Sequence, residues 1–277
     1  MIANEPLDLD KCFEVGKSVA IEAGKVIKEA FKKEKRIEVK GSAIDLVTET
    51  DQNVEKMVIS TIKENFPTHC FIGEESTAAG VKNELTDDPT WIIDPIDGTT
   101  NFVHTFPYTC ISIGLLVNKK PVIGLVYSPV QNEMYTAQAG KGAFCNDERI
   151  YVSSCKDLQL ALILTDHGYS NDPTIVDIEY KNMRLVKSHS RGIRSVGSAA
   201  MSMCLVASGA ADGYYEYGLH CWDIAAGVLL VEEAGGINMD PLGGPLDIMS
   251  RGILCTSSKE LAEQISKDIQ PIEFERD

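Results

Sequence analysis

Two aspartates stand at the end of an apolar run, where they could hold divalent cations against a phosphate. Asp94 and Asp97 follow the apolar residues 91–93, with a proline between them and Gly98 directly after. The run predicts a short buried strand that stops at the carboxylates, and the glycine lets the main chain approach a ligand closely. Thr99 predicts the first turn of a helix, whose N–H groups could bind a phosphate while the carboxylates bind hard cations. Taken alone, the segment fits a solvated acidic turn equally well.

Further carboxylates stand at the ends of other predicted elements. Glu74 comes after the apolar run 70–73, Asp51 opens an amphipathic helix, and Asp223 opens an apolar helix. Each has a local explanation, because a carboxylate in a first helical turn complements the helix dipole. Thr48 together with Asp51 also resembles a capping box. With the two aspartates above, however, five carboxylates at element ends favour one shared site.

Composition narrows the possible partners. The chain has 277 residues and a formal net charge of −15, which argues against nucleic acid or an anionic membrane as a partner. An anionic substrate would also be repelled, and bound divalent cations would resolve that conflict locally. Because no proline-rich or low-complexity linker divides the chain, we expect a single domain over 1–277. Its N-terminal metal-binding half would cover about 1–155 and its C-terminal half about 156–277.

The cysteines predict a reducing compartment. Eight cysteines are scattered without a Cys-x-x-Cys pair, and residues 1–6 show no secretory leader. We expect reduced core thiols in a cytoplasmic protein. His220 beside Cys221 could suggest a ligand pair, but we expect structural roles, because adjacent residues on an extended segment point to opposite faces. No apolar run reaches membrane-spanning length.

The order of elements predicts an α/β (α+β) fold. A first amphipathic helix is expected over residues 8–34, and an antiparallel meander over 111–117, 122–127 and 133–137. The second half alternates strands with helices, which predicts a second, covered sheet. Its strands are expected at 160–165, 193–195, 214–216 and 253–256, and its helices at 198–208, 223–234 and 258–269.

The segments 45–51, 74–75, 91–99 and 222–227 resemble, in order and spacing, the signatures of the inositol monophosphatase family. The resemblance covers nearly the whole chain and is greatest to the animal cytosolic members. It implies a five-layer αβαβα sandwich that pairs into a homodimer. It also implies a lithium-sensitive, magnesium-dependent enzyme that hydrolyses myo-inositol monophosphates to inositol and phosphate.

The resemblance implies a definite set of metal ligands. One magnesium ion would be held by Glu74, Asp94 and the backbone carbonyl of Ile96. A second would be held by Asp94, Asp97 and Asp223. A weaker third ion would lean on Glu74. Oxygen ligands alone suit magnesium, and two such ions can clamp both oxygens of an in-line displacement.

Catalytic and substrate-binding roles are implied in the same way. Thr99, held by Asp51, would orient the attacking water, and Glu74 would take part in catalysis. Glu216 would accept inositol hydroxyls, although an exposed charge at a strand end is the simpler interpretation of that residue. Lys40 would support the charge near the metals. The implied substrate contacts are Asp97, Gly98, Thr99, Ala199, Glu216 and Asp223.

Two alternatives remain. The chain could be a phosphatase that prefers another sugar phosphate such as galactose 1-phosphate, or a non-catalytic relative that binds metal and sugar phosphate or a protein. Loss of a metal carboxylate or of the threonine would mark a non-catalytic relative, and the sequence retains all of these positions. The absence of large insertions favours a small monophosphate, an inference that depends on analogy of fold.

Overall fold

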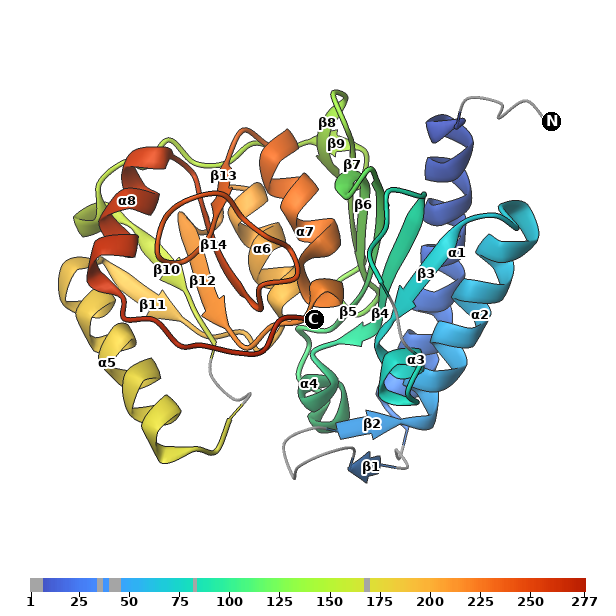
Figure 1. The fold of residues 1–277 in the computed structure, drawn as a ribbon, viewed down its shortest axis with the longest axis horizontal. Helices are drawn as coiled ribbons and strands as arrows, with labels where there is room; N and C mark the ends of the chain where they lie inside the picture. The colour runs from blue at the N-terminus through green and yellow to red at the C-terminus, as the bar shows by residue number, and fades with distance from the viewer. Residues whose placement is uncertain (1–6, 34–36, 40–45, 82–83, 167–169) are drawn as a thin grey trace.

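Helices and sheets stack in five layers (Figure 1). The structure, a computed structural model, describes residues 7–33, 37–39, 46–81, 84–166 and 170–277. One helix pair flanks a seven-stranded sheet, a central pair separates it from a five-stranded sheet, and a third pair covers the far face. In that order the helices are α1 (Leu9–Phe31) and α2 (Glu49–Asn65), α6 (Ala199–Ala207) and α7 (Cys221–Glu233), and α5 (Pro173–His189) and α8 (Lys259–Asp268). The predicted αβαβα sandwich is therefore confirmed.

The seven-stranded sheet follows the order of the chain. Strands β3 and β4 are parallel, and the later neighbours are antiparallel. The meander predicted over 111–137 is confirmed, and it continues into β8 and β9, which the sequence analysis does not predict. The strands are β3 (Cys70–Gly73), β4 (Thr90–Asp97), β5 (Cys110–Val117), β6 (Lys120–Ser128), β7 (Glu133–Gln138), β8 (Gly142–Cys145) and β9 (Glu148–Arg149).

Strand β4 carries two of the candidate metal ligands. The expected strand over residues 91–93 is too short, because β4 runs on through both aspartates. Asp94 pairs with Ser112 of β5, and the register shifts before the next pair at Asp97. Proline cannot donate to a ladder and is tolerated at bulges, so Pro95 falls where the pairing is interrupted. Both carboxylates thus lie on a strand and not on a loop.

The five-stranded sheet is mixed and has the order β11-β10-β12-β14-β13. β10 pairs in parallel with β11 and β12, whereas β14 pairs antiparallel with β12 and β13. The predicted alternation is confirmed, but α5 and β13 are additional. Asp172 caps α5 and Pro173 stands in its first turn, a start signal that the sequence analysis does not use. The strands are β10 (Leu162–Leu164), β11 (Gly192–Arg194), β12 (Gly213–Tyr217), β13 (Ile237–Met239) and β14 (Gly252–Thr256).

Short elements complete the chain, and several of them surround the acidic residues. The first helix ends at Phe31, earlier than predicted, with Lys32 as its C-cap after the last residue of the buried face. The short elements are β1 (Ile37–Val39), β2 (Leu46–Thr48), α3 (Glu74–Ala78), α4 (Thr99–His104) and η1 (Leu158–Leu160).

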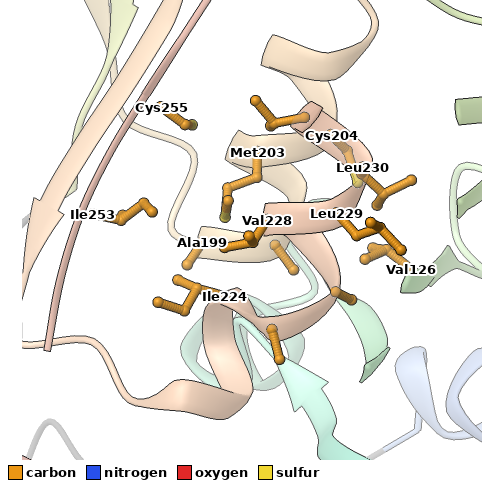
Figure 2. Close-up of a cluster of buried hydrophobic side chains, with 14 of the residues drawn as sticks. Val126, Ala199, Met203, Cys204, Ile224, Val228, Leu229, Leu230, Ile253 and Cys255 are labelled. Carbon is orange, nitrogen blue, oxygen red and sulfur yellow. The ribbon is translucent and has the colours of Figure 1, made fainter. Parts of the chain in front are cut away.

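Helix α7 lies at the centre of the core. All its residues from Cys221 to Val231 are buried, which is typical of a helix that is apolar on every side. In Figure 2, α6 and α7 meet side chains from both sheets, such as Val126 of β6 and Ile253 of β14. At Gly114 of β5, a Cβ would lie 2.9 Å from the Ala225 Cβ, so glycine permits the close approach. The helix is therefore fixed against both halves.

Candidate metal centre and active site

Three aspartates from distant parts of the chain converge. Asp94 and Asp97 lie at the end of β4, and Asp223 lies in the first turn of α7. One carboxylate oxygen from each lies within 4.8 Å of the others. All three are buried, at 2%, 4% and 5% exposed. Over the part of the chain that the structure describes, no other group of three acidic, histidine or cysteine ligands converges in this way.

Asp94 lies near four other acidic side chains. Its Oδ1 accepts the Ile96 N–H at 3.0 Å, which closes the bulge in β4. Burial raises the pKa of Asp94 well above its usual range, and the negative charges of Glu74, Asp97, Asp223 and Asp51 raise it further. Like charges buried together without a counter-charge are costly, so this arrangement suits cation binding.

Donors from the C-terminal half hold Asp97. Its Oδ2 accepts hydrogen bonds from Ser198 Oγ at 2.6 Å and from the Ala200 N–H at 2.7 Å. Burial raises the pKa of Asp97 to about 6, and the hydrogen bonds from Ser198, Ala200 and the Ala199 amide oppose that rise. The predicted substrate contact Ala199 therefore lies beside Asp97. The sequence analysis missed Ser198 and Ala200, because their proximity to Asp97 depends on how the two halves of the chain pack.

Thr99 and Asp51 lie together although 48 residues separate them. Thr99 Oγ1 is 3.3 Å from Asp51 Oδ1 and 3.0 Å from the Ile96 carbonyl oxygen. Asp51 Oδ2 accepts the Thr48 N–H at 2.9 Å and a short hydrogen bond from the Thr48 hydroxyl, so the predicted capping box is confirmed. Burial raises the pKa of Asp51 to about 7. One carboxylate thus connects the start of α2 to the start of α4.

Gly98 makes the turn between β4 and α4. Its φ of +81° lies in the left-handed region that favours glycine. A Cβ at this position would lie 2.9 Å from the Tyr108 carbonyl oxygen and 3.0 Å from that of Gly197. Any side chain would therefore displace the backbone beside Asp97 and Thr99.

Glu74 begins α3, directly after β3. A second acid of α2, Glu55, fixes this helical turn, because its carboxylate accepts the Glu75 N–H at 2.7 Å and the Ser76 N–H at 2.8 Å. Glu55 is buried, and the sequence analysis missed it. The available signal was its spacing, since it lies four residues after Asp51 on the same helix face.

Glu216 is buried, so its interpretation as an exposed charge at a strand end is wrong. It lies on β12 and is 3% exposed, and Tyr214 Oη donates a short hydrogen bond to its Oε2. Burial raises the pKa of Glu216 well above its usual range, and Asp166, Asp223 and Asp97 raise it further. Sequence reasoning missed Asp166, which accepts the Gly197 N–H at 3.0 Å.

The carboxylate set fits magnesium. The converging donors are oxygens, which magnesium prefers. The pKa values of Asp94, Asp97 and Asp223 are all raised by burial, and those of Asp94 and Asp223 also by neighbouring acids, so a divalent cation would relieve the repulsion. The Ile96 carbonyl, an implied ligand, lies beside this cluster and accepts the Thr99 hydroxyl.

Comparison with known proteins decides the family. A model of the inositol monophosphatase family matches residues 8–273. The chain belongs to the inositol monophosphatase family. It is 54% identical over 268 residues to inositol monophosphatase 1 of Bos taurus and to that of Homo sapiens, covering 96% of this chain and 97% of each relative. The solved inositol monophosphatase from Anabaena (Nostoc) matches with a TM-score of 0.81 and 33% identity over 95% of this chain and 96% of that one.

Several other expectations can be compared with this inositol monophosphatase fold. All eight cysteines are free, as predicted, but the expectation that all lie in the core is wrong, because Cys70, Cys145 and Cys155 are only half-buried. His220 and Cys221 contact Asp277 in a structural arrangement, although Cys221 begins a helix and does not lie on an extended segment. Lys40 lies outside the described residues. None of the helices that the structure describes is both long and apolar enough to cross a membrane.

Proposed function

We propose that this chain is a magnesium-dependent phosphomonoesterase that hydrolyses myo-inositol monophosphates to inositol and phosphate. The observation that carries the proposal is the convergence of Asp94, Asp97 and Asp223 beside the Gly98 turn, in a chain of the inositol monophosphatase family. The high identity to curated inositol monophosphatases over nearly the whole chain supports the same reaction.

The proposed metal ligands are those expected from the sequence. Glu74, Asp94 and the Ile96 carbonyl would hold one magnesium ion, and Asp94, Asp97 and Asp223 would hold a second. A third, weaker ion would lie against Glu74. When bound, such ions neutralise phosphate charge and lower the pKa of a water molecule.

Thr99 and Asp51 are proposed to orient the attacking water. The Thr99 hydroxyl has one hydrogen, and it can be donated to Asp51 Oδ1 or to the Ile96 carbonyl. Its oxygen lone pairs then remain available to accept a hydrogen from water, which leaves a lone pair of that water to attack phosphorus. The amides of Gly98 and Thr99 would bind the phosphate.

Inositol recognition is assigned to Glu216, Asp223 and the Ala199 amide. Buried carboxylates accept hydroxyl hydrogens well and reject analogues that lack those hydroxyls. We further propose one domain over 1–277 that acts as a homodimer in the cytoplasm. The core shared by both sheets supports a single domain, and eight free cysteines suit a reducing compartment.

A panel of phosphate monoesters tests this proposal. Phosphate release should be fastest with an inositol monophosphate, should cease after chelation and should return with magnesium. Activity that survives chelation would overturn the metal dependence, and a preference for galactose 1-phosphate would overturn the substrate assignment. Absence of release from every ester, in a chain that binds magnesium, would favour a non-catalytic relative. Asp94→Asn serves as the inactive control.

A further inference from the structure

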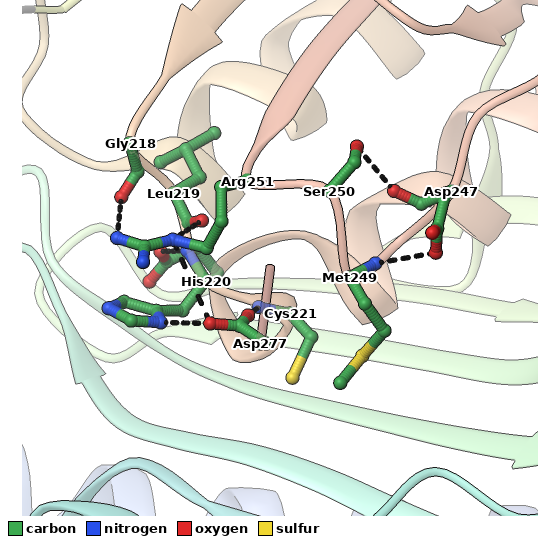
Figure 3. Close-up of polar contacts among 10 residues, drawn as sticks. Gly218, Leu219, His220, Cys221, Asp247, Met249, Ser250, Arg251 and Asp277 are labelled. Atoms are coloured by element: carbon green, nitrogen blue, oxygen red, sulfur yellow. Dashed lines mark hydrogen bonds and ion pairs between the residues drawn. The ribbon is translucent and has the colours of Figure 1, made fainter. Parts of the chain in front are cut away.

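The side chain of Asp277 lies against His220 and Cys221 at the start of α7 (Figure 3). Asp223 is the third residue of this helix. Asp277 Oδ1 lies 2.6 Å from His220 Nδ1, and Oδ2 accepts the Cys221 N–H at 2.9 Å. The Asp277 side chain is only 11% exposed. One carboxylate therefore contacts both the N-cap residue and the first residue of the helix.

Neighbouring contacts fix the position of this carboxylate. The Asp277 N–H donates to the Met249 carbonyl at 3.1 Å, and Arg251 Nε lies 3.7 Å from Asp277 Oδ1. Arg251 also donates to the carbonyls of Leu219 and Gly218, at 2.5 and 2.7 Å, which gathers the turn before α7 around the same group (Figure 3). Asp277 is thus held from two sides.

Asp277 and Asp223 accept adjacent N–H groups at the start of α7. The first N–H groups of a helix lack internal partners and attract carboxylates. Asp223 Oδ2 already accepts the His220 N–H at 2.6 Å, while Asp277 accepts the next N–H, that of Cys221. Without Asp277, the Cys221 N–H would compete for Asp223 and draw it away from Asp94. The His220 ring, stacked on Trp222 with centroids 4.3 Å apart, would also lose its anchor.

We propose that Asp277 is a positioning residue for magnesium binding. It holds the turn from His220 to Asp223 in the geometry in which Asp223 approaches Asp94 and Asp97. The inference relies on the proposed function only for the assignment of Asp223 as a metal ligand. A purely structural cap would make a different prediction, because its loss would lower the melting temperature without changing magnesium affinity.

The test compares Asp277→Ala, Asp277→Asn and Asp277→Glu with wild type. Magnesium binding to the metal-free protein is measured by calorimetry, and the magnesium concentration for half-maximal phosphate release from inositol monophosphate is measured in parallel. Loss of a group that orients a metal ligand typically costs about 10-fold to 100-fold in metal affinity. We expect Asp277→Ala to weaken magnesium binding by about 10-fold or more, with KM at saturating magnesium changed less than about twofold. Asp277→Glu, which keeps the carboxylate, should recover part of the loss.

A matched control comes from the other side of the molecule. Asp268 Oδ2 lies 2.7 Å from His189 Nδ1, so it forms the same kind of pair on α8, in the outer layer (Figure 1). Asp268→Ala should leave magnesium affinity unchanged. Asp277→Asn removes the charge but keeps an oxygen that can accept the Cys221 N–H, so it separates the loss of charge from the loss of the acceptor. If Asp277→Ala does not fold, Asp277→Leu, which offers no acceptor, provides the same comparison.

Two results would overturn the inference. The first is unchanged magnesium affinity in a folded variant that lacks the acceptor, Asp277→Ala or Asp277→Leu, even with a lower melting temperature. The second is an equal loss of affinity in Asp268→Ala, which would indicate a general effect of stability. A wild-type chain that binds magnesium but releases no phosphate would contradict the proposed function alone, since calorimetry would still measure the effect of Asp277.

Discussion

Helices α2 and α7 begin alike, but their first turns differ in what the acidic residue can do. The third residue of each helix is an aspartate that accepts the N–H of the N-cap residue. Asp51 accepts the Thr48 N–H at 2.9 Å, and Asp223 accepts the His220 N–H at 2.6 Å. The similarity ends there, because the two carboxylates have different further neighbours.

In α2 the further hydrogen-bonding partners are hydroxyl groups, although Glu74 lies close enough to raise the pKa of Asp51. In α7 the carboxylates of Asp94 and Asp97 converge on Asp223. Asp51 accepts the Thr48 hydroxyl and lies 3.3 Å from the hydroxyl of Thr99. Asp223 instead faces Asp94 and Asp97, while Asp277 accepts the adjacent amide of α7. A helix cap therefore does not define a role by itself. On the proposed function, the remaining partners decide whether the carboxylate orients a hydroxyl or binds a cation.

Asp223→Asn should have the largest effect on activity. Asparagine can still accept the His220 N–H, so the helix start is retained, but the charge that faces Asp94 is lost. We expect phosphate release to fall by more than about a hundredfold and metal-free stability to rise, because repulsion among the acids decreases. Steady-state kinetics and thermal melting measure the two effects. Activity close to wild type would contradict a role for Asp223 in metal binding, and with it the proposed difference between α7 and α2.

Asp51→Asn and Thr99→Ala test whether Asp51, at the start of α2, acts on turnover through the Thr99 hydroxyl. If the pair works as one device, each change should cost about a hundredfold in kcat, and the double variant should cost little more than the worse single one. The double-mutant cycle is measured at saturating magnesium and substrate. If Asp51 only caps its helix, its loss should lower stability by about 1 kcal/mol, and its kinetic effect should be small and additive.

Glu216→Gln extends the comparison of Asp51 and Asp223 to a third buried acid. Glu216 is not one of the three converging aspartates. Loss of its charge-assisted hydrogen bond to an inositol hydroxyl should cost about 1.5–3 kcal/mol in kcat/KM for inositol monophosphate. An aryl phosphate, which has no matching hydroxyls, should be affected less. Equal losses on both substrates would contradict a role in recognition. A shifted magnesium requirement would place Glu216 among the metal ligands.

Stability of the metal-free protein should fall as pH rises from about 4 to about 7. Burial raises the pKa of Asp97 to about 6 and that of Asp51 to about 7, both above the usual 3.8. The folded chain therefore binds more protons than the unfolded chain in this window, so the free energy of unfolding decreases with pH. Chemical denaturation in a chelator measures the slope, and saturating magnesium should reduce it. Stability that rises between about pH 4 and about pH 7 would contradict the raised pKa values of Asp97 and Asp51.

The sequence predicted most elements and the acid positions because both depend on local boundaries between strands and helices, whereas the five-layer arrangement was implied by the family resemblance. Asp94 and Asp223 stand where an apolar pattern changes, and such changes can be recognised without tertiary information. Ser198 and Asp277 could not be found in this way, and Glu55 was indicated only by its helical spacing from Asp51. Each acts on a residue more than 15 positions away, so its role exists only after the layers have packed.

Local patterning also explains the elements that were missed. Helix α5 buries only Asn182 and Val186, so its apolar stripe is too narrow to stand out in the sequence. Strand β13 has three residues, a length at which periodicity carries little information. The early end predicted for β4 has a different cause, because the pattern ended at Asp94 while backbone pairing resumed beyond the bulge.

The burial of α7 between the two sheets has a consequence for the order in which the chain folds. This helix cannot complete its packing until strands from both halves have formed, and contacts between distant segments form slowly. Asp223 would therefore meet Asp94 late in folding, and their repulsion would oppose the final step. We expect magnesium to accelerate refolding of wild type in stopped-flow experiments and to have little effect on Asp94→Asn. The cation would then act as a folding partner before it acts on any substrate.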